Sequence, residues 1–89
     1  MPVICRFLGI IITMYWNDHS PPHFHARYNN FSALIDIKTG KVIKGKFPSK
    51  QLKKVDKWRK INMSELKENW KRARKNQTLL PIEALYEEK

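Results

Sequence analysis

The stretch of sequence that decides the fold runs from residue 23 to residue 37 and reads HFHARYNNFSALIDI. Two alternating segments flank the pair Asn29-Asn30, and asparagine tolerates the positive φ that a tight two-residue turn requires. The stretch therefore predicts a β-hairpin with an apolar face and a polar face. The expected pairs are Tyr28 with Phe31, Ala26 with Ala33 and Phe24 with Ile35 on the apolar face, and Arg27 with Ser32, His25 with Leu34 and His23 with Asp36 on the polar face. A shift of one residue would turn His23 and Arg27 toward the core, so burial favours this register.

The segments beside this hairpin extend it into a sheet. Residues 3–7 and 10–16 have the composition of a strand that is broken or bulged at Gly9. The adjacent prolines at 21 and 22 cannot donate to a sheet ladder, so residues 17–22 form a loop. Lys38-Thr39-Gly40 predicts a second turn, followed by a short strand over residues 41–45. We therefore expect an antiparallel β-meander of three to four strands over about residues 3–45.

After Pro48 the apolar residues recur with the helical period. They predict one helix over about residues 49–62 and a second over about residues 65–76, with Ser64 as its N-cap. Strands followed by helices are typical of an α+β domain, and we expect a single one over residues 1–76. Residues 77–89 form a tail that either packs through its apolar side chains or remains partly disordered.

The net charge of +10 is concentrated in the middle of the chain. Residues 38–76 hold fifteen lysines and arginines against three acidic residues, whereas the charges of residues 1–37 cancel. Such a surplus favours a polyanionic partner, either RNA or another nucleic acid or an acidic protein. A solvated lysine-rich surface without a partner is the alternative. The candidate phosphate contacts are Lys53, Lys54, Arg72 and Arg74.

Several classes of protein are disfavoured by what the chain lacks. It has no apolar run of about 18 residues and no signal peptide, so we expect a cytoplasmic protein without a membrane partner. Its single cysteine, Cys5, cannot form an internal disulfide and is typical of a small buried hydrophobe. No Walker loop, dinucleotide fingerprint, nucleophile elbow or zinc-finger spacing is present.

The polar face of the predicted hairpin carries the candidate chemistry. His23 and His25 project alike and form a candidate acid–base pair, and Thr13 and Tyr15 belong to a neighbouring strand. Asp36 lies opposite His23 and can orient its imidazole, while Arg27 can grip a phosphate through two donors. These groups suit metal-independent RNA cleavage, which needs a base, an acid and a cation.

Two other interpretations of the histidines remain open. His19, His23 and His25 together with Asp18 could hold Zn²⁺ or another transition metal. Alternatively, the histidine loop is structural, with His25 packed against a tryptophan of a helix. The protein would then be a non-catalytic module that binds nucleic acid or an acidic partner protein.

Five segments carry a resemblance to a known family: MPVI at residues 1–4, RFLGI at 6–10, MY at 14–15, DHSPPHFHA at 18–26 and EL-x-x-NW at 65–70. Over residues 1 to about 76 the chain resembles the small bacterial proteins catalogued as Domain of Unknown Function 4160. This resemblance implies a compact bacterial cytoplasmic protein, encoded beside a small partner protein in the manner of toxin–antitoxin pairs. The three histidines match motif positions, but the lysine-rich segment 38–60 departs from more neutral members.

Overall fold

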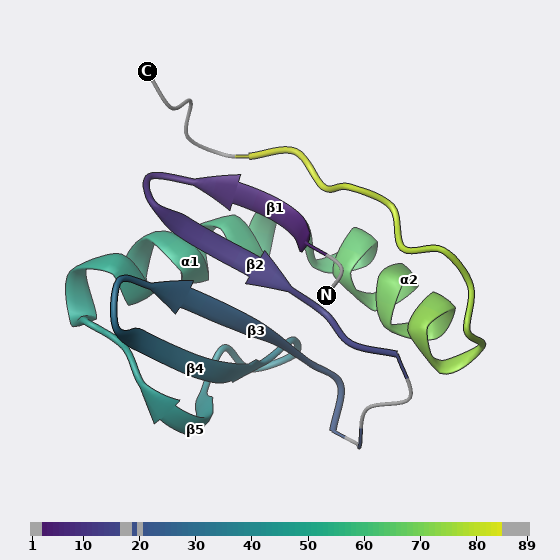
Figure 1. Cartoon of the computed structure of the whole chain (residues 1–89), viewed down its shortest axis with the longest axis horizontal. Helices are drawn as coiled ribbons and strands as arrows, with labels where there is room; N and C mark the ends of the chain where they lie inside the picture. The colour runs from purple at the N-terminus through teal and green to yellow at the C-terminus, as the bar shows by residue number, and fades with distance from the viewer. Residues whose placement is uncertain (1–2, 17–18, 20, 85–89) are drawn as a thin grey trace.

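The computed structural model describes residues 3–16, 19 and 21–84, which form a sheet followed by two helices (Figure 1). The elements are β1 (Val3–Phe7), β2 (Ile10–Thr13), β3 (His23–Tyr28), β4 (Phe31–Asp36), β5 (Val42–Lys46), α1 (Ser49–Ile61) and α2 (Met63–Arg74). The strands lie in sequential order and every neighbouring pair is antiparallel. The predicted α+β class is thus confirmed.

The sheet has five strands, so the expected count of three to four was too low. The difference arises at Leu8 and Gly9, which both have positive φ, 50° and 76°. This conformation reverses the chain in a two-residue hairpin turn, so the segments expected to be one broken strand become β1 paired with β2. Leucine rarely adopts positive φ, which is why the pattern indicated a bulge.

The hairpin of β3 and β4 has the predicted register throughout, from His23 opposite Asp36 to Tyr28 opposite Phe31. Asn29 takes the positive φ expected in the turn, 51°. The apolar face of the sheet packs against residues of both helices; in Figure 1, α1 lies behind the sheet and α2 lies to its right. Trp58 of α1 is fully buried there, with its ring centroid 5.6 Å from that of Phe7 and 5.7 Å from that of Phe24.

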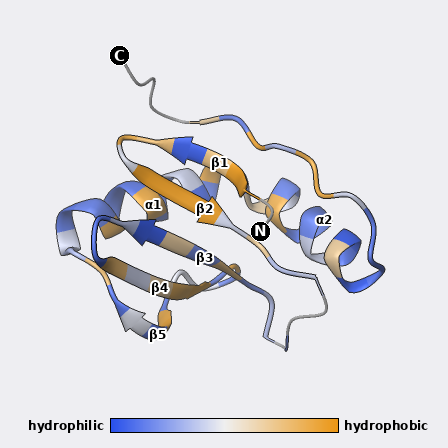
Figure 2. Cartoon of the chain, viewed as in Figure 1, coloured by the Kyte–Doolittle hydropathy of each residue, from blue (hydrophilic) through white to orange (hydrophobic). Residues whose placement is uncertain are grey.

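Figure 2 shows hydrophobic residues along β1 and β2 and hydrophilic residues over much of the two helices. The helices therefore present an apolar side to the sheet and a charged side to the solvent. None of the helices in the described part of the chain has both the length and the apolar character needed to cross a membrane.

The ends of α2 test two sequence predictions. The prediction of Ser64 as N-cap is wrong, because α2 already begins at Met63 and Asn62 alone separates it from α1. The predicted end of the second helix near residue 76 is confirmed: Asn76 has φ 56°, and its N–H donates to the carbonyl of Ala73 at 3.3 Å. The N–H of Gln77 donates to Arg72 at 2.8 Å, which completes a Schellman motif.

Arg59 joins α1 to the turn between β4 and β5, and an ion pair within α1 holds its guanidinium group. The side chain of Arg59 is only 4% exposed, and its Nη2 lies 2.8 Å from Oδ1 of Asp56. Its Nη1 donates to the carbonyl oxygens of Ile37 at 2.9 Å and Lys38 at 3.1 Å. The charge is thus buried with its hydrogen bonds satisfied, which is the condition for tolerating it in a core.

The segment that follows α2 packs on the domain as far as the structure describes it, to residue 84. The N–H of Ile82 donates to the carbonyl of Ile4 at 2.7 Å, so this segment covers the outer edge of β1. Trp58 donates its indole N–H to the carbonyl of Glu83 at 3.0 Å. Leu85, one of the apolar residues of the predicted tail, lies outside the described residues.

Candidate functional site

One face of the sheet carries no helix (Figure 1). The pleat that sends Ile10, Ile12 and Ala26 to the core sends the intervening residues to this uncovered face. Across the strands, Arg6 pairs with Ile11, and Ile11 pairs with Arg27. In the neighbouring row, Thr13 lies opposite His25.

The uncovered face is hollowed, with a cavity of about 560 Å³. Its walls come from β1, β2, β3, β4 and the turn between β3 and β4. The lining residues are Val3, Arg6, Ile11, Thr13, Tyr15, His25, Ala26, Arg27, Asn29, Asn30, Phe31 and Ser32. The hollow thus combines two guanidinium groups, one imidazole and one phenol with an apolar floor.

His25 is half-buried in this hollow and contacts Tyr15 edge to face, with ring centroids 4.4 Å apart. An aromatic neighbour in this geometry fixes the imidazole plane without covering it. Arg27, two residues further along β3, is exposed. Of the four residues predicted as a catalytic group, these two lie together at the hollow.

His23 does not project into water, contrary to the sequence prediction. It is only 4% exposed, and its ring lies 5.1 Å from that of Trp70 and 5.4 Å from that of His25. The reason is that α2 packs over the start of β3, so the tryptophan contact expected for His25 is made by His23. Its Nδ1 lies 2.8 Å from the carbonyl oxygen of Pro21, which only accepts, so Nδ1 carries the proton.

Asp36 lies opposite His23 in the register, as predicted. Its Oδ1, however, accepts hydrogen bonds from the backbone N–H groups of Lys38 at 2.8 Å and Thr39 at 3.0 Å. The carboxylate therefore caps the turn between β4 and β5. Nδ1 of His23 and Oδ1 of Asp36 are thus each directed at a nearby backbone group.

The four predicted phosphate contacts lie on the helices, on the other side of the sheet from the hollow. Lys53 and Arg74 are exposed, and Lys54 is half-buried. Arg72 is also half-buried, and its Nη1 donates to Oδ1 of Asn69 at 2.9 Å. The helix cations and the hollow are thus two separate basic regions.

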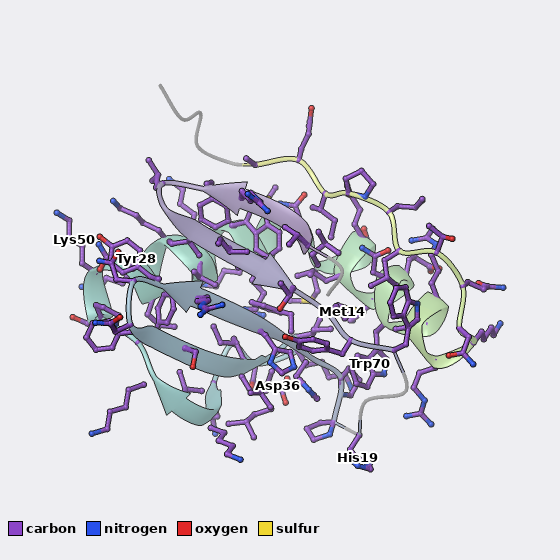
Figure 3. All side chains as sticks on the ribbon, in the orientation of Figure 1. Met14, His19, Tyr28, Asp36, Lys50 and Trp70 are labelled. Carbon is purple, nitrogen blue, oxygen red and sulfur yellow. The ribbon has the colours of Figure 1, made fainter. Side chains whose placement is uncertain are left out.

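The proposed metal ligands are not clustered in the described part of the chain. Among residues 3–16, 19 and 21–84, no three His, Cys, Asp or Glu side chains could hold one ion together. His19 lies on the connection between β2 and β3, well apart from Asp36 (Figure 3). Asp18 lies outside the described residues.

Cys5 is buried, as the sequence indicated. Burial raises the pKa of its thiol to about 11, although hydrogen bonds with the Trp58 side chain and the Arg6 backbone lower it. The thiol is therefore protonated at neutral pH and is a poor nucleophile.

The sequence prediction missed Arg6. Its place in the hollow follows only once β1 and β2 are known to pair, which puts Arg6 and Arg27 on either side of Ile11. The sequence shows the alternation of residues 3–7, but it does not show the positive φ of Leu8 that turns β1 back against β2.

The fold and site define a small α+β domain with one face of its sheet under helices and the other hollowed and basic. A family model described as a domain of unknown function (DUF4160) matches residues 9–71, and the chain belongs to this family. The matched segment contains His25 and Arg27 but not Arg6. No curated protein and no solved structure is significantly similar to the chain.

Proposed function

We propose that this protein binds single-stranded RNA on the uncovered face of its sheet. The observation that carries the proposal is the hollow of about 560 Å³ in which Arg6, Tyr15, His25 and Arg27 meet. Exposed antiparallel sheets with aromatic residues are used by other RNA-binding modules, which stack unpaired bases on them.

The residue types in the hollow suit the two parts of a nucleotide. A guanidinium group offers a planar fork of donors that matches the oxygens of a phosphate. Tyr15 and His25 offer ring surface, and base stacking on an aromatic ring is sequence-tolerant. The arginines would therefore hold the backbone, while the ring pair holds a base.

The net charge of the chain supports the same class of ligand. A charge of +10 on 89 residues raises the local concentration of a polyanion around the whole protein. The lysines of α1 and α2 contribute to this long-range attraction. Such contacts give affinity that falls with salt and carries no sequence information.

The test compares Arg27→Gln with Lys57→Gln, which removes the same charge from the exposed side of α1. Binding of a short fluorescent single-stranded RNA is followed by anisotropy over a range of salt concentrations. Arg27→Gln is expected to weaken binding about tenfold and to lower the salt slope by about one. Lys57→Gln is expected to weaken it less than about twofold. Equal effects of the two variants would contradict a site in the hollow.

RNA cleavage is the second candidate function, because the imidazole of His25 lies in the same hollow as the two arginines. In this reaction His25 takes the proton of a 2′-hydroxyl, whose oxygen attacks the adjacent phosphorus. The bond to the 5′-oxygen breaks, and that oxygen takes a proton from water, which gives a 2′,3′-cyclic phosphate and a 5′-hydroxyl. His23, which is buried, would act as a positioning residue through its contact with His25.

Cleavage is tested with end-labelled RNA in the presence of EDTA, comparing the wild type with His25→Gln. We expect cyclic-phosphate ends from the wild type and at least a hundredfold loss in the variant. If the wild type binds RNA without cleaving it, or if His25→Gln cleaves equally well, the catalytic role is rejected and binding alone stands.

A further inference from the structure

A second concave site lies between α2 and the end of the sheet, on the helical side of the molecule. It is a slot of about 240 Å³, separate from the hollow. Its lining residues are Pro22, Ile37, Lys38, Lys67, Trp70 and Lys71. None of these residues has a role in the proposed RNA site.

The floor of the slot is apolar and buried. Ile37 is fully buried, and Trp70 is 7% exposed. The Trp70 ring packs against the ring of His23, with centroids 5.1 Å apart. A preformed apolar surface of this kind favours an aliphatic or aromatic side chain over water.

The rim of the slot is cationic. Lys67 and Lys71 are one turn apart on α2, and Lys38 comes from the turn after β4; all three are exposed. Like charges four residues apart on a helix destabilise it slightly. The Lys71–Glu68 pair, at 3.6 Å, joins two side chains that are each more than half exposed, so it offsets little of this charge.

The indole N–H of Trp70 differs from those of the other two tryptophans. Trp16 donates to the carbonyl of Gln77 at 2.8 Å, and Trp58 donates to Glu83 at 3.0 Å. Within the described part of the chain, Trp70 has no such acceptor. Since no fully buried side-chain nitrogen there is left unpaired, this N–H reaches the surface. It is a donor available to a ligand.

We propose that this slot binds an acidic peptide segment of a partner protein. One apolar side chain of the peptide fills the slot, neighbouring carboxylates lie against the three lysines, and the peptide supplies an acceptor to the Trp70 indole N–H. The apolar lining favours a peptide over RNA, because it offers few polar groups to hydrogen-bond a base. The occupant is thus defined by charge complementarity and by the apolar floor.

The experiment follows the three indole N–H signals by NMR while acetyl-Glu-Glu-Leu-Glu-Glu-amide is added up to about millimolar concentration. The variant Trp70→Phe identifies the Trp70 signal. We expect this signal to move downfield while those of Trp16 and Trp58 stay in place. The matched probes are the same peptide with lysine in place of glutamate, and with alanine in place of leucine.

Two charge variants complete the experiment, each lacking two exposed lysines. Lys67→Gln/Lys71→Gln is expected to raise the peptide Kd about fivefold, whereas Lys50→Gln/Lys57→Gln on α1 leaves it within about twofold. Arg27→Gln is expected to leave it unchanged, which separates this proposal from the RNA site. The proposal is overturned if the Trp70 signal does not move, if the lysine peptide moves it equally, or if a short RNA shifts it more than the acidic peptide does.

Discussion

Gly40, in the turn between β4 and β5, has no room for a side chain. Its φ is +78°, and a Cβ atom there would lie 2.3 Å from Oδ1 of Asp56 and 2.8 Å from Nε of Arg59. Glycine at this position therefore allows both the backbone conformation and the close approach of the ion pair that holds α1.

We expect Gly40→Ala to lower the free energy of unfolding by at least about 2 kcal/mol, because it adds backbone strain and displaces a buried ion pair. Gly9→Ala is the control, since its φ is +76° but the nearest atom to the added Cβ is 3.4 Å away. It should cost about 1 kcal/mol. If urea denaturation gives the same loss of unfolding free energy for both variants, the ion pair tolerates the extra methyl group.

Asp56 makes the stability depend on pH. Partial burial alone would raise its pKa, but hydrogen bonds and charges from Arg59 and Lys60 outweigh this and hold the pKa below its ordinary value of 3.8. A carboxyl group whose pKa is lower in the folded state contributes stability above its unfolded pKa. That contribution is lost as the pH falls through the folded pKa.

The variant Asp56→Asn should be less stable than the wild type by about 2 kcal/mol at neutral pH, because it leaves Arg59 buried without its partner. This difference should begin to shrink when the pH is lowered below about 4, the pKa of an unfolded aspartate, and should disappear below the folded pKa, where the wild type also loses the charge. Thermal unfolding measured from neutral pH to acid pH would check this. A difference that stays constant with pH would show that the carboxylate charge is not responsible.

At the scale of elements, Asn69 joins α2 to the segment that follows it. Its Nδ2 donates to the carbonyl of Leu80 at 2.8 Å, and its Oδ1 accepts from the N–H of Leu80 at 3.0 Å. Asn69 is 1% exposed, so both interactions replace hydrogen bonds to water. The Asn69 side chain thus pairs with both backbone groups of Leu80, as a neighbouring strand would.

We expect Asn69→Ala to cost about 2 kcal/mol, because it leaves two backbone groups of Leu80 without partners. Amide exchange at Leu80 and Ile82 should accelerate more than exchange in β3. Thr78→Ala, at an exposed position in the same segment, should change the stability by less than about 0.5 kcal/mol. Unchanged exchange at Ile82 would show that Asn69 does not hold this segment.

The elements that the sequence predicted well are those with strong local signals. The Asn29-Asn30 turn and the alternation on both sides of it determined the register of β3 and β4. The apolar spacing after Pro48 placed α1 at its observed start, Ser49. The turn at Leu8 was missed because its positive φ depends on the pairing of β1 with β2, which is a property of the sheet and not of leucine.

At the scale of the whole molecule, the parts of the candidate site that the sequence predicted are those set by local structure. His25 and Arg27 share a face because a strand alternates, which is a local property. The burial of His23 depends on α2, which is 40 residues or more later in the chain and packs Trp70 against it. Burial by a distant element has no signature in the residues around His23.

The two proposed binding sites, one for RNA and one for an acidic peptide, lie on different sides of the domain. The hollow lies on the side of the sheet without helices, and the slot beside Trp70 lies against α2. If both proposals hold, RNA and an acidic peptide can be bound at the same time. The matched variants separate the two sites because each alters one of them.

The central claim is that the uncovered face of the sheet is the RNA-binding surface. It is tested most directly by mapping backbone amide shifts in NMR spectra as a short single-stranded RNA is added. We predict that the largest changes fall on Arg6, Thr13, His25 and Arg27, and that the amides of α1 change little. The largest changes on Lys53, Lys54 and the rest of α1, with β2 and β3 unaffected, would contradict the claim.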